Sequence, residues 1–222
     1  MEIPDFKALL FMKGHSERIP RKNMKPFCGR PLFHWIIETL LKCNYISEII
    51  INTDSEEIAE NAEKNFHVTI HMRPDYLNRI TSNEANQIIE YDINKTDGKF
   101  FLQTHSTNPL LRLDTINNAI RYYIDNIEKY DSLFTVTSQY KRFYYKNGKP
   151  INHNPLILEK TQLLKPIFEE NSCLYLFTRE SFSINNNRIG QKPLMFEINN
   201  YESLDIDEQF DFEYAEMVKK ND

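Results

Sequence analysis

The segment between Lys13 and Lys25 has the residue types that bind phosphate. It contains five basic side chains and a single acidic one, in a chain whose net charge is −5. Gly14 lets the backbone approach an anion closely, and backbone N–H groups at a helix N-terminus bind phosphate oxygens. Lysine and arginine stabilise the charge that develops on a leaving polyphosphate. The segment predicts a site for a phosphorylated ligand, with a solvated basic loop as the alternative.

A pair of carboxylates, Asp205 and Asp207, stands near the C-terminus. Side chains two residues apart in a strand point to the same face of the sheet. Mg²⁺ prefers oxygen ligands, and proteins often hold it through one or two carboxylates together with substrate phosphates. The pair is therefore a candidate Mg²⁺ site, and an acidic turn that caps the last helix is the alternative.

Composition limits the class of protein. The chain has 222 residues, which suits a single domain over 1–222, and its negative charge argues against a nucleic-acid partner. No run approaches the roughly 20 apolar residues of a transmembrane helix, and the N-terminus has no secretory pattern. The three cysteines have no metal-ligand spacing, which favours reduced thiols. We expect a cytoplasmic protein that does not enter a membrane.

Strand and helix signals alternate along most of the chain, which predicts a parallel sheet with helices on both faces. In such sheets ligands bind outside the carboxyl ends of the strands. The basic segment follows the first predicted strand and so falls at that edge. The predicted strands are 7–12, 47–53, 67–73, 99–104, 132–138 and 172–178, and the predicted helices are 31–43, 55–65, 82–94 and 113–127.

Short polar residues mark the helix starts. Either Asp54 or Ser55 is expected to cap the second helix, and Asp114 the fourth. Residues 202–220 are expected to form a short strand, an acidic turn and a terminal amphipathic helix.

Residues 139–171 differ in texture from the rest of the chain. They contain a KNGKP turn signal and three prolines, with little helical periodicity. We interpret them as a hairpin-like arm or insertion. Their apolar side chains, among them Tyr144 and Leu158, need a surface to cover them. That surface is either a partner or the arm's own domain.

Two stretches carry a resemblance to a known family. The segment 13–23 reads KGHSERIPRKN, and 29–32 reads GRPL. In order and spacing they resemble the signature of the acylneuraminate cytidylyltransferases, the CMP-sialic acid synthetases and their relatives. That signature is approximately R-G-G-S-K-G-I-P-x-K-N, followed by G-[KR]-P-L and a helix. Further matches follow in the family's order: Thr53 and Asp54, Arg73 with Pro74 and Leu77, Gln103 and Pro109, and Asp205 with Asp207.

The resemblance implies an enzyme with a three-layer, Rossmann-like nucleotidyltransferase fold, a mostly parallel sheet and a dimerisation arm. It implies Mg²⁺-dependent transfer of CMP from CTP to a sugar acid or phospho-sugar, with release of pyrophosphate, in bacterial surface glycan synthesis. A C2 homodimer is implied as well. Two alternatives stay open: a nucleotide-sugar-dependent glycosyltransferase and a non-catalytic nucleotide-binding module.

Residue roles follow from the same resemblance. Lys22, Lys13 and Asp207 are the expected catalytic residues. Asp205 and Asp207 are the expected Mg²⁺ ligands. The expected CTP-binding residues are Lys13, Gly14, His15, Ser16, Arg21, Lys22, Asn23, Arg73, Thr81 and Ser82. The expected acceptor-binding residues are Gln103, Lys165, Glu169, Glu170, Asn171 and Tyr175.

The chain departs from the family pattern at several of these positions. Lys13 replaces an arginine, so a point charge takes the place of a two-pronged guanidinium. His15 replaces a glycine, and Glu17 replaces a lysine. On the acceptor side, sialic acid enzymes generally present an arginine in the segment before the predicted strand 172–178. Here that segment has Lys165 as the candidate replacement, and Glu169 and Glu170 are acidic. We therefore expect a less usual acidic acceptor, and no residue is predicted as the catalytic base.

Overall fold

The computed structural model describes residues 4–79 and 84–221. In this part of the chain one sheet has the strand order β5-β4-β1-β6-β8-β7-β9. β8 runs antiparallel to both of its neighbours, and the other neighbouring pairs are parallel. The mostly parallel sheet is thus confirmed. Its strands are β1 (Phe6–Met12), β4 (Ile46–Thr53), β5 (Thr69–Met72), β6 (Phe100–Thr104), β7 (Ser132–Gln139), β8 (Ile167–Thr178) and β9 (Pro193–Glu197).

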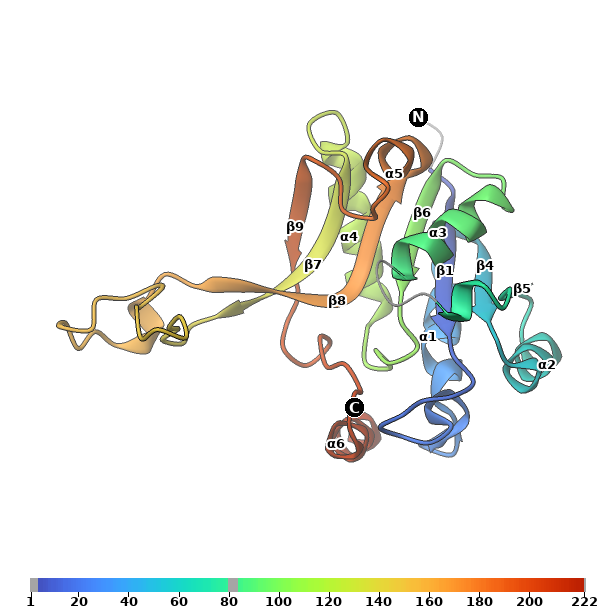
Figure 1. The fold of residues 1–222 in the computed structure, drawn as a ribbon, viewed down its shortest axis with the longest axis horizontal. Helices are drawn as coiled ribbons and strands as arrows, with labels where there is room; N and C mark the ends of the chain where they lie inside the picture. The colour runs from blue at the N-terminus through green and yellow to red at the C-terminus, as the bar shows by residue number, and fades with distance from the viewer. Residues whose placement is uncertain (1–3, 80–83, 222) are drawn as a thin grey trace.

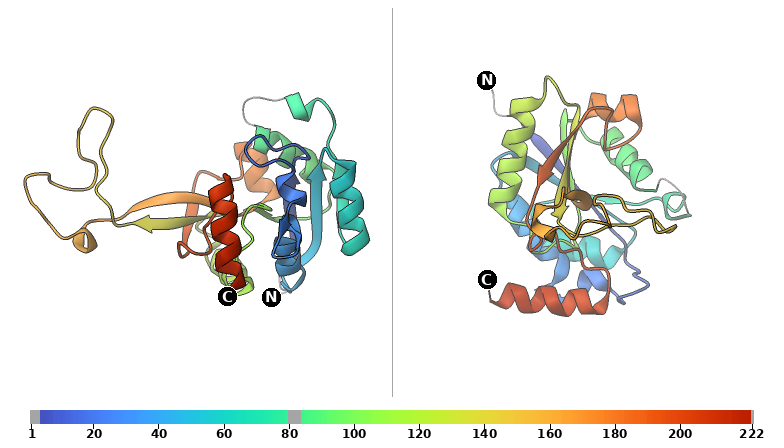
Figure 2. Two further views of the ribbon diagram at one scale, coloured as in Figure 1. Left: turned by 90° about the horizontal axis from the view of Figure 1, so that it is seen from below. Right: turned by 90° about the vertical axis from the view of Figure 1, so that its left-hand side faces the viewer.

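Helices cover both faces of the sheet, as Figures 1 and 2 show. α1 (Leu32–Leu41), α2 (Glu56–Asn65) and α4 (Leu113–Asn126) lie on one face, and α3 (Glu84–Asn94) and α5 (Arg179–Asn185) lie on the other. Successive residues of a strand point to opposite faces, so each buried strand feeds two cores. In β1, for example, Leu10 packs with the first group of helices and Leu9 with the second. The three-layer arrangement is confirmed.

A smaller apolar cluster lies beyond the carboxyl ends of the parallel strands. It joins α6 (Gln209–Lys220) to the chain between β1 and α1. That connection contains η1 (Lys22–Met24) and the two-residue strands β2 (Pro26–Phe27) and β3 (Arg30–Pro31). Figure 1 shows α6 and this connection side by side below the sheet. The buried members of the cluster are Ile19, Phe27, Leu32, Leu110, Ile206, Phe212 and Ala215.

Two predictions near helix ends have different outcomes. Ser55 caps α2, because its hydroxyl accepts a hydrogen bond from the Ile58 N–H. The prediction of Asp114 as the cap of α4 is wrong: Arg112 is the N-cap, and Asp114 lies in the first turn. A carboxylate there still interacts favourably with the helix dipole, so Asp114 stabilises the helix although it does not cap it.

The C-terminal third contains elements that the sequence did not predict. α5 and β9 were missed, and the short strand expected after residue 202 does not form. Residues 204–207 are an extended loop, in which the Ile206 N–H donates to the Thr107 carbonyl. β9 takes the edge of the sheet beside β7. Asp205 and Asp207 therefore stand on a loop that leads into α6.

The arm projects away from the sheet and its helices (Figures 1 and 2). Its base is a two-stranded extension in which residues 136–139 of β7 pair with residues 167–170 of β8. Beyond this base the arm contains η3 (Thr161–Leu163) and an isolated bridge between Tyr144 and Pro150. The alternative in which the arm packs on its own domain is wrong. Leu156 and Leu158 are 92% and 95% exposed.

No helix in the described residues is long and apolar enough to cross a membrane.

Candidate active site

A cavity of about 420 Å³ opens at the carboxyl ends of β1, β4 and β6. In-register pairing brings these ends together, with Met12 beside Thr53 and Leu10 beside Thr104. Part of the predicted phosphate-binding set lines this cavity, which we call the basic cleft. From that set the lining includes Lys13, His15, Ser16, Lys22 and Asn23, and it also includes Glu17, Arg18, Asp54, His105 and Ser106.

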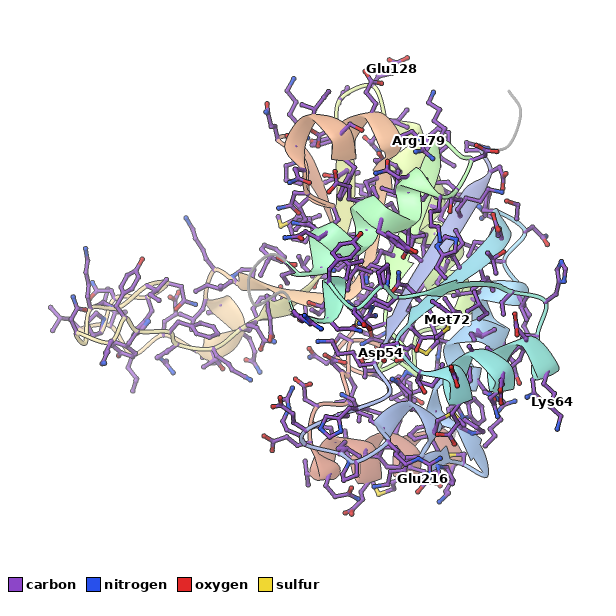
Figure 3. All side chains as sticks on the ribbon, turned by 45° about the vertical axis from the view of Figure 1, so that its right-hand side comes forward. Asp54, Lys64, Met72, Glu128, Arg179 and Glu216 are labelled. Atoms are coloured by element: carbon purple, nitrogen blue, oxygen red, sulfur yellow. The ribbon has the colours of Figure 1, made fainter. Side chains whose placement is uncertain are left out.

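Gly14 holds the basic loop against the start of α2. Its N–H donates to Asp54 Oδ1 at 2.7 Å. A Cβ at this position would lie 2.7 Å from Ser55 Cβ, closer than van der Waals contact allows. Glycine is therefore needed for the approach of two protein segments, whatever it does toward a phosphate. Figure 3 shows Asp54 at this edge of the sheet, above the layer that contains Glu216 of α6.

Lys22 reaches from the basic cleft toward the carboxylate pair. Its Nζ donates to the Ile206 carbonyl at 2.6 Å and lies 3.9 Å from Asp207 Oδ1. Burial lowers the pKa of Lys22, while Asp205 and Asp207 act in the opposite direction. This largely buried ammonium lies where the basic cleft meets the two carboxylates. It is placed to bind the phosphates of a ligand in the cleft.

Asn23 fixes the position of the loop. Its Nδ2 donates to the Lys13 carbonyl at 2.9 Å, and its Oδ1 accepts from the Ser106 hydroxyl at 2.6 Å. Both ends of this buried amide are thus satisfied within the protein. Asn23 ties the loop after β1 to the loop after β6 and so defines the shape of the cleft.

Two neighbouring arginines have different partners. Arg18 lines the basic cleft and pairs with Asp207 Oδ1 at 2.6 Å. Arg21, which was expected to bind CTP, has a left-handed backbone and pairs with Glu57 of α2. Arg18 is therefore the guanidinium at the cleft, and Arg21 holds the loop to a helix.

A second cavity, of about 360 Å³, lies beside the basic cleft and is rich in acidic side chains. We call it the acidic cavity. The Arg18–Asp207 and Lys22–Asp207 contacts connect the two cavities. Its lining includes Glu169, Glu170, Asn171, Ser172, Asp205 and Asp207.

Asp205 has the features of a metal ligand. Its Oδ1 is buried without a hydrogen-bond partner in the described residues, and burial raises the pKa of its carboxyl group. The described residues contain no cluster of three or more His, Cys, Asp or Glu placed to hold a metal ion. Two protein carboxylates that leave further positions to phosphate oxygens fit Mg²⁺.

β8 is bent at the acidic cavity. Phe134 pairs with Tyr175 while Val136 pairs with Glu170, so residues 171–174 bulge out of the ladder with β7, although Leu174 still pairs with Thr104 of β6. Ser172 has a left-handed backbone within the bulge. Bulges of this kind re-aim side chains and occur near active sites. Here the bulge separates the arm half of β8 from the half in the main sheet.

Arg73 is buried below the basic cleft, where it joins two strand ends. Its Nε donates to Asn52 Oδ1 at 2.7 Å, and Asn52 Nδ2 donates to Asp92 Oδ1 at 2.8 Å. Asp92 also contacts His71 at 2.7 Å. This network holds the Arg73 guanidinium at the carboxyl ends of β1 and β4. The other predicted cytidine contacts, Thr81 and Ser82, lie outside the described residues.

Gln103 and Tyr175, predicted to bind the acceptor, meet two residues that the sequence analysis missed. The Gln103 amide donates to the ring of His105 at 3.0 Å and accepts from Arg188 at 2.5 Å. Arg188 stacks on the ring of Tyr175. Burial, with Arg188 and Lys22 nearby, lowers the pKa of His105 to about 3, so its imidazole is neutral. His105 directly follows the end of a predicted strand, and this position could have identified it as a candidate site residue.

The remaining predicted acceptor residues are placed differently. Glu169 accepts from Gln139 at 2.8 Å, and Glu170 accepts from the Tyr175 hydroxyl. Both border the acidic cavity and are exposed. Lys165 lies on the arm with an exposed side chain, outside both cavities.

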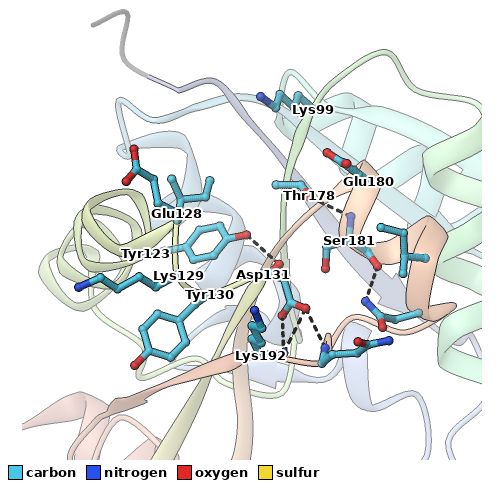
Figure 4. A pocket seen from close by; sticks show the side chains of 14 residues that line it. Lys99, Tyr123, Glu128, Lys129, Tyr130, Asp131, Thr178, Glu180, Ser181 and Lys192 are labelled. Carbon is cyan, nitrogen blue, oxygen red and sulfur yellow. Dashed lines mark hydrogen bonds between the residues drawn. The ribbon is translucent and has the colours of Figure 1, made fainter.

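A cavity of about 480 Å³, shown in Figure 4, lies at the other edge of the sheet. Its lining includes Lys99 before β6 and Asp131 before β7, so it opens at the amino ends of parallel strands. Figure 3 labels Glu128 and Arg179 near this edge, far from Asp54. Although this cavity is larger than the basic cleft, we assign the ligand to the carboxyl ends of the strands, where open α/β sheets bind their ligands.

A sequence model of the family described as cytidylyltransferase matches residues 8–222. The chain belongs to the cytidylyltransferase family. Membership confirms the resemblance seen in the basic loop and argues against the glycosyltransferase alternative.

Curated relatives show which members of the cytidylyltransferase family the chain is similar to. N-acylneuraminate cytidylyltransferase A of Danio rerio is 26% identical over 218 residues, which cover 95% of this chain and 50% of the relative. Pseudaminic acid cytidylyltransferase of Campylobacter jejuni is 27% identical over 222 residues, which cover 94% and 93%. The chain thus spans about half the length of the fish relative and nearly all of the bacterial one.

Solved structures agree on the fold. A CMP:2-keto-3-deoxy-manno-octonic acid synthetase complexed with CTP superposes with a TM-score of 0.70 at 11% identity, over 98% of this chain and 99% of that one. The 4-diphosphocytidyl-2C-methyl-D-erythritol synthase of Anaerococcus prevotii gives 0.66 at 12% identity, over 97% and 96%. At such identities these likenesses establish the nucleotidyltransferase fold.

Proposed function

We propose that this chain transfers CMP from CTP to the anomeric hydroxyl of an acidic sugar and releases pyrophosphate. The observation that carries the proposal is the junction of the two cavities at Lys22. A basic cleft suited to a triphosphate meets an acidic cavity suited to a hydroxylated acceptor. The named substrates of the curated relatives, N-acylneuraminate and pseudaminic acid, support an acidic sugar as the acceptor.

In this reaction the acceptor oxygen forms a bond to the α-phosphorus of CTP. The bond from that phosphorus to the bridging oxygen of the β-phosphate breaks, the pyrophosphate leaves, and the hydroxyl proton passes to solvent water. Lys13, Arg18 and Lys22 line the cleft where the phosphates would lie and would stabilise their charge. Lys22, which already contacts the acidic cavity through Asp207, is placed to act on the phosphates nearest the acceptor.

Asp205 and Asp207 would hold Mg²⁺ together with phosphate oxygens. The unpartnered oxygen of Asp205 supports this assignment. When bound, the ion would supply positive charge that neutralises the triphosphate and polarises its phosphoryl oxygens. Arg18 pairs with Asp207 in the structure, so CTP binding would draw this guanidinium from the carboxylate to the phosphates.

The oligomeric state and location belong to the same proposal. The apolar tip of the arm is suited to a second copy of the chain, in a C2 homodimer. A CTP-dependent enzyme is expected in the cytoplasm, and synthesis of a surface glycan would be the use of its product.

The proposal is tested by pyrophosphate release from CTP and MgCl₂ with a panel of acceptors. The panel contains N-acetylneuraminate, pseudaminic acid, ketodeoxyoctonate and several phospho-sugars. Release with an acidic sugar, strongly reduced in Lys22→Ala, is the expected result. If CTP binds in calorimetry but no acceptor causes release, the chain is a nucleotide-binding module and the proposal fails.

A further inference from the structure

Arg188 stands where three distant segments meet. It lies between α5 and β9, outside every motif considered in the sequence. Its guanidinium carbon is 3.6 Å from the centroid of the Tyr175 ring, and one terminal nitrogen donates to Gln103 Oε1 at 2.5 Å. Stacking and hydrogen bonding together fix the plane and one edge of the guanidinium. A guanidinium has five N–H donors, so this arrangement leaves capacity for a further two-pronged contact.

The charge of Arg188 is not matched by an ion pair in the described part of the chain. Gln103 is neutral, and Tyr175 has a pKa raised to about 12 by burial. The carboxylate that acts on Arg188 electrostatically is Glu170, which already accepts the Tyr175 hydroxyl. Burial lowers the pKa of Arg188, but an arginine stays charged in a protein. A half-buried cation with neutral hydrogen-bond partners favours an anionic ligand.

The position of Arg188 says which anion this is. Its partner Gln103 contacts the ring of His105, which lines the basic cleft. Its other partner, Tyr175, donates to Glu170, which borders the acidic cavity. Arg188 lines neither cavity itself, but through these two partners it stands next to a lining residue of each. An acceptor whose hydroxyl reaches the α-phosphate would extend past Arg188.

We infer that Arg188 binds the carboxylate of the acceptor, with Tyr175 and Gln103 holding its guanidinium in place. This inference rests on the proposed transfer reaction and narrows its acceptor class to sugars that carry a carboxylate. Arg188 then supplies the positive charge that the sequence lacks beside the acidic cavity, where Glu169 and Glu170 stand. The two glutamates are left to contact hydroxyl or amine groups of the same sugar.

The test compares Arg188→Gln with the parent protein, using the most active acidic sugar of the panel and its methyl ester. In the parent the acid should be preferred over the ester. In Arg188→Gln the KM for the acid should rise roughly 30- to 300-fold, the KM for CTP should change less than about threefold, and the preference for the acid should disappear. Arg188→Lys should recover only part of the loss, because a point charge cannot form the fork.

Arg121→Gln is the matched control. It removes the same charge from an exposed position on α4, on the other face of the sheet. Its acid and ester kinetics should equal those of the parent. Thermal unfolding and CTP calorimetry check that each variant is folded. If Arg188→Gln is unstable, Arg188→Lys provides the comparison, with a raised KM for the acid expected.

Two outcomes overturn the inference. An Arg188 variant with the acid KM and acid preference of the parent excludes carboxylate binding and leaves the transfer reaction intact. A selective rise in the CTP KM means that Arg188 binds the nucleotide phosphates instead. The proposed function itself is overturned if none of the acceptors causes the parent to release pyrophosphate and no acidic sugar binds in calorimetry with CTP present.

Discussion

Arg21 and Lys22 are adjacent in the sequence but have unlike surroundings. Lys22 is largely buried and donates to the Ile206 carbonyl between the two cavities. Arg21 is exposed and pairs with Glu57 of α2. The difference arises from the left-handed backbone of Arg21, which turns consecutive side chains in different directions. At this scale, the number of charges in the loop matters less than where each side chain points.

Replacing Lys22 by Ala should lower kcat about 10²- to 10³-fold, since a preorganised donor to developing charge is typically worth a few kcal/mol. Replacing Arg21 by Ala should change kcat less than about threefold, because an exposed ion pair contributes little. Initial rates of pyrophosphate release measure both. Equal losses in the two variants would show that the loop acts through its total charge.

His105 should make the protein less stable in acid. Its folded pKa is about 3 against an ordinary value of 6.5. The unfolded chain therefore binds a proton in a range where the folded protein does not. The contribution of neutral His105 to the free energy of unfolding is fully present above pH 6.5. It is lost as the pH falls toward 3, with a slope of up to about 1.4 kcal/mol per pH unit.

Chemical denaturation between pH 7 and pH 4 measures this effect as a difference between parent and His105→Gln. The variant should have a flatter dependence of the free energy of unfolding on pH. Parallel curves for the two proteins would mean that folding does not change the pKa of His105.

At the scale of elements, the site depends on three loops that follow β1, β4 and β6. Gly14 and Asn23 fix their mutual positions through contacts to Asp54, to Ser106 and to the backbone of Lys13. Most of these contacts hold one loop to another. Some motif residues therefore set the shape of the cleft instead of facing a ligand. The bulge in β8 then places the acidic cavity beside it.

Gly14→Ala should destabilise the protein by about 1–3 kcal/mol, because the new methyl group would overlap Ser55 Cβ. Ser55→Gly removes that atom at a cost of a few tenths of a kcal/mol for the cap. The double variant should therefore be more stable than the sum of the single changes predicts, by about 1 kcal/mol. Additive changes in the free energy of unfolding would show that the two residues are not in contact.

Much of the sheet could be predicted because buried parallel strands consist of continuous apolar and β-branched runs, as in β1 and β4. β9 (PLMFE) could not, since this short run begins with a proline and, at the edge of the sheet, only its Leu194 is buried. The basic cleft followed from a motif at a strand end. Arg188 could not be predicted, because its role depends on a loop that brings it to β6 and β8, far away in the sequence.

At the scale of the whole molecule, the arm (residues 139–171) leaves large apolar side chains exposed in a single chain. It extends from β7 and β8, away from the sheet and its helices (Figure 2), and its residues Leu156, Ile157 and Leu158 are exposed. Because β8 also forms the wall of the acidic cavity, a second copy bound to the arm would act on the strand that shapes the site.

Replacing Leu156, Ile157 and Leu158 together by Ser should convert a dimer into a monomer. These side chains are exposed in one chain, and the substitution removes the apolar area available to a partner. Light scattering coupled to size exclusion gives the mass. Ile184→Ser on α5 is the control, because Ile184 is also exposed but lies away from the arm. A parent protein that runs as a stable monomer would contradict the assignment.

The central claim is that the anomeric hydroxyl of an acidic sugar attacks the α-phosphorus of CTP. The most direct measurement is mass spectrometry of the products formed from CTP and an acceptor labelled with ¹⁸O at that hydroxyl. The account predicts a CMP–sugar that retains the label and an unlabelled pyrophosphate. Free CMP as the product, or a CMP–sugar without the label, would contradict it.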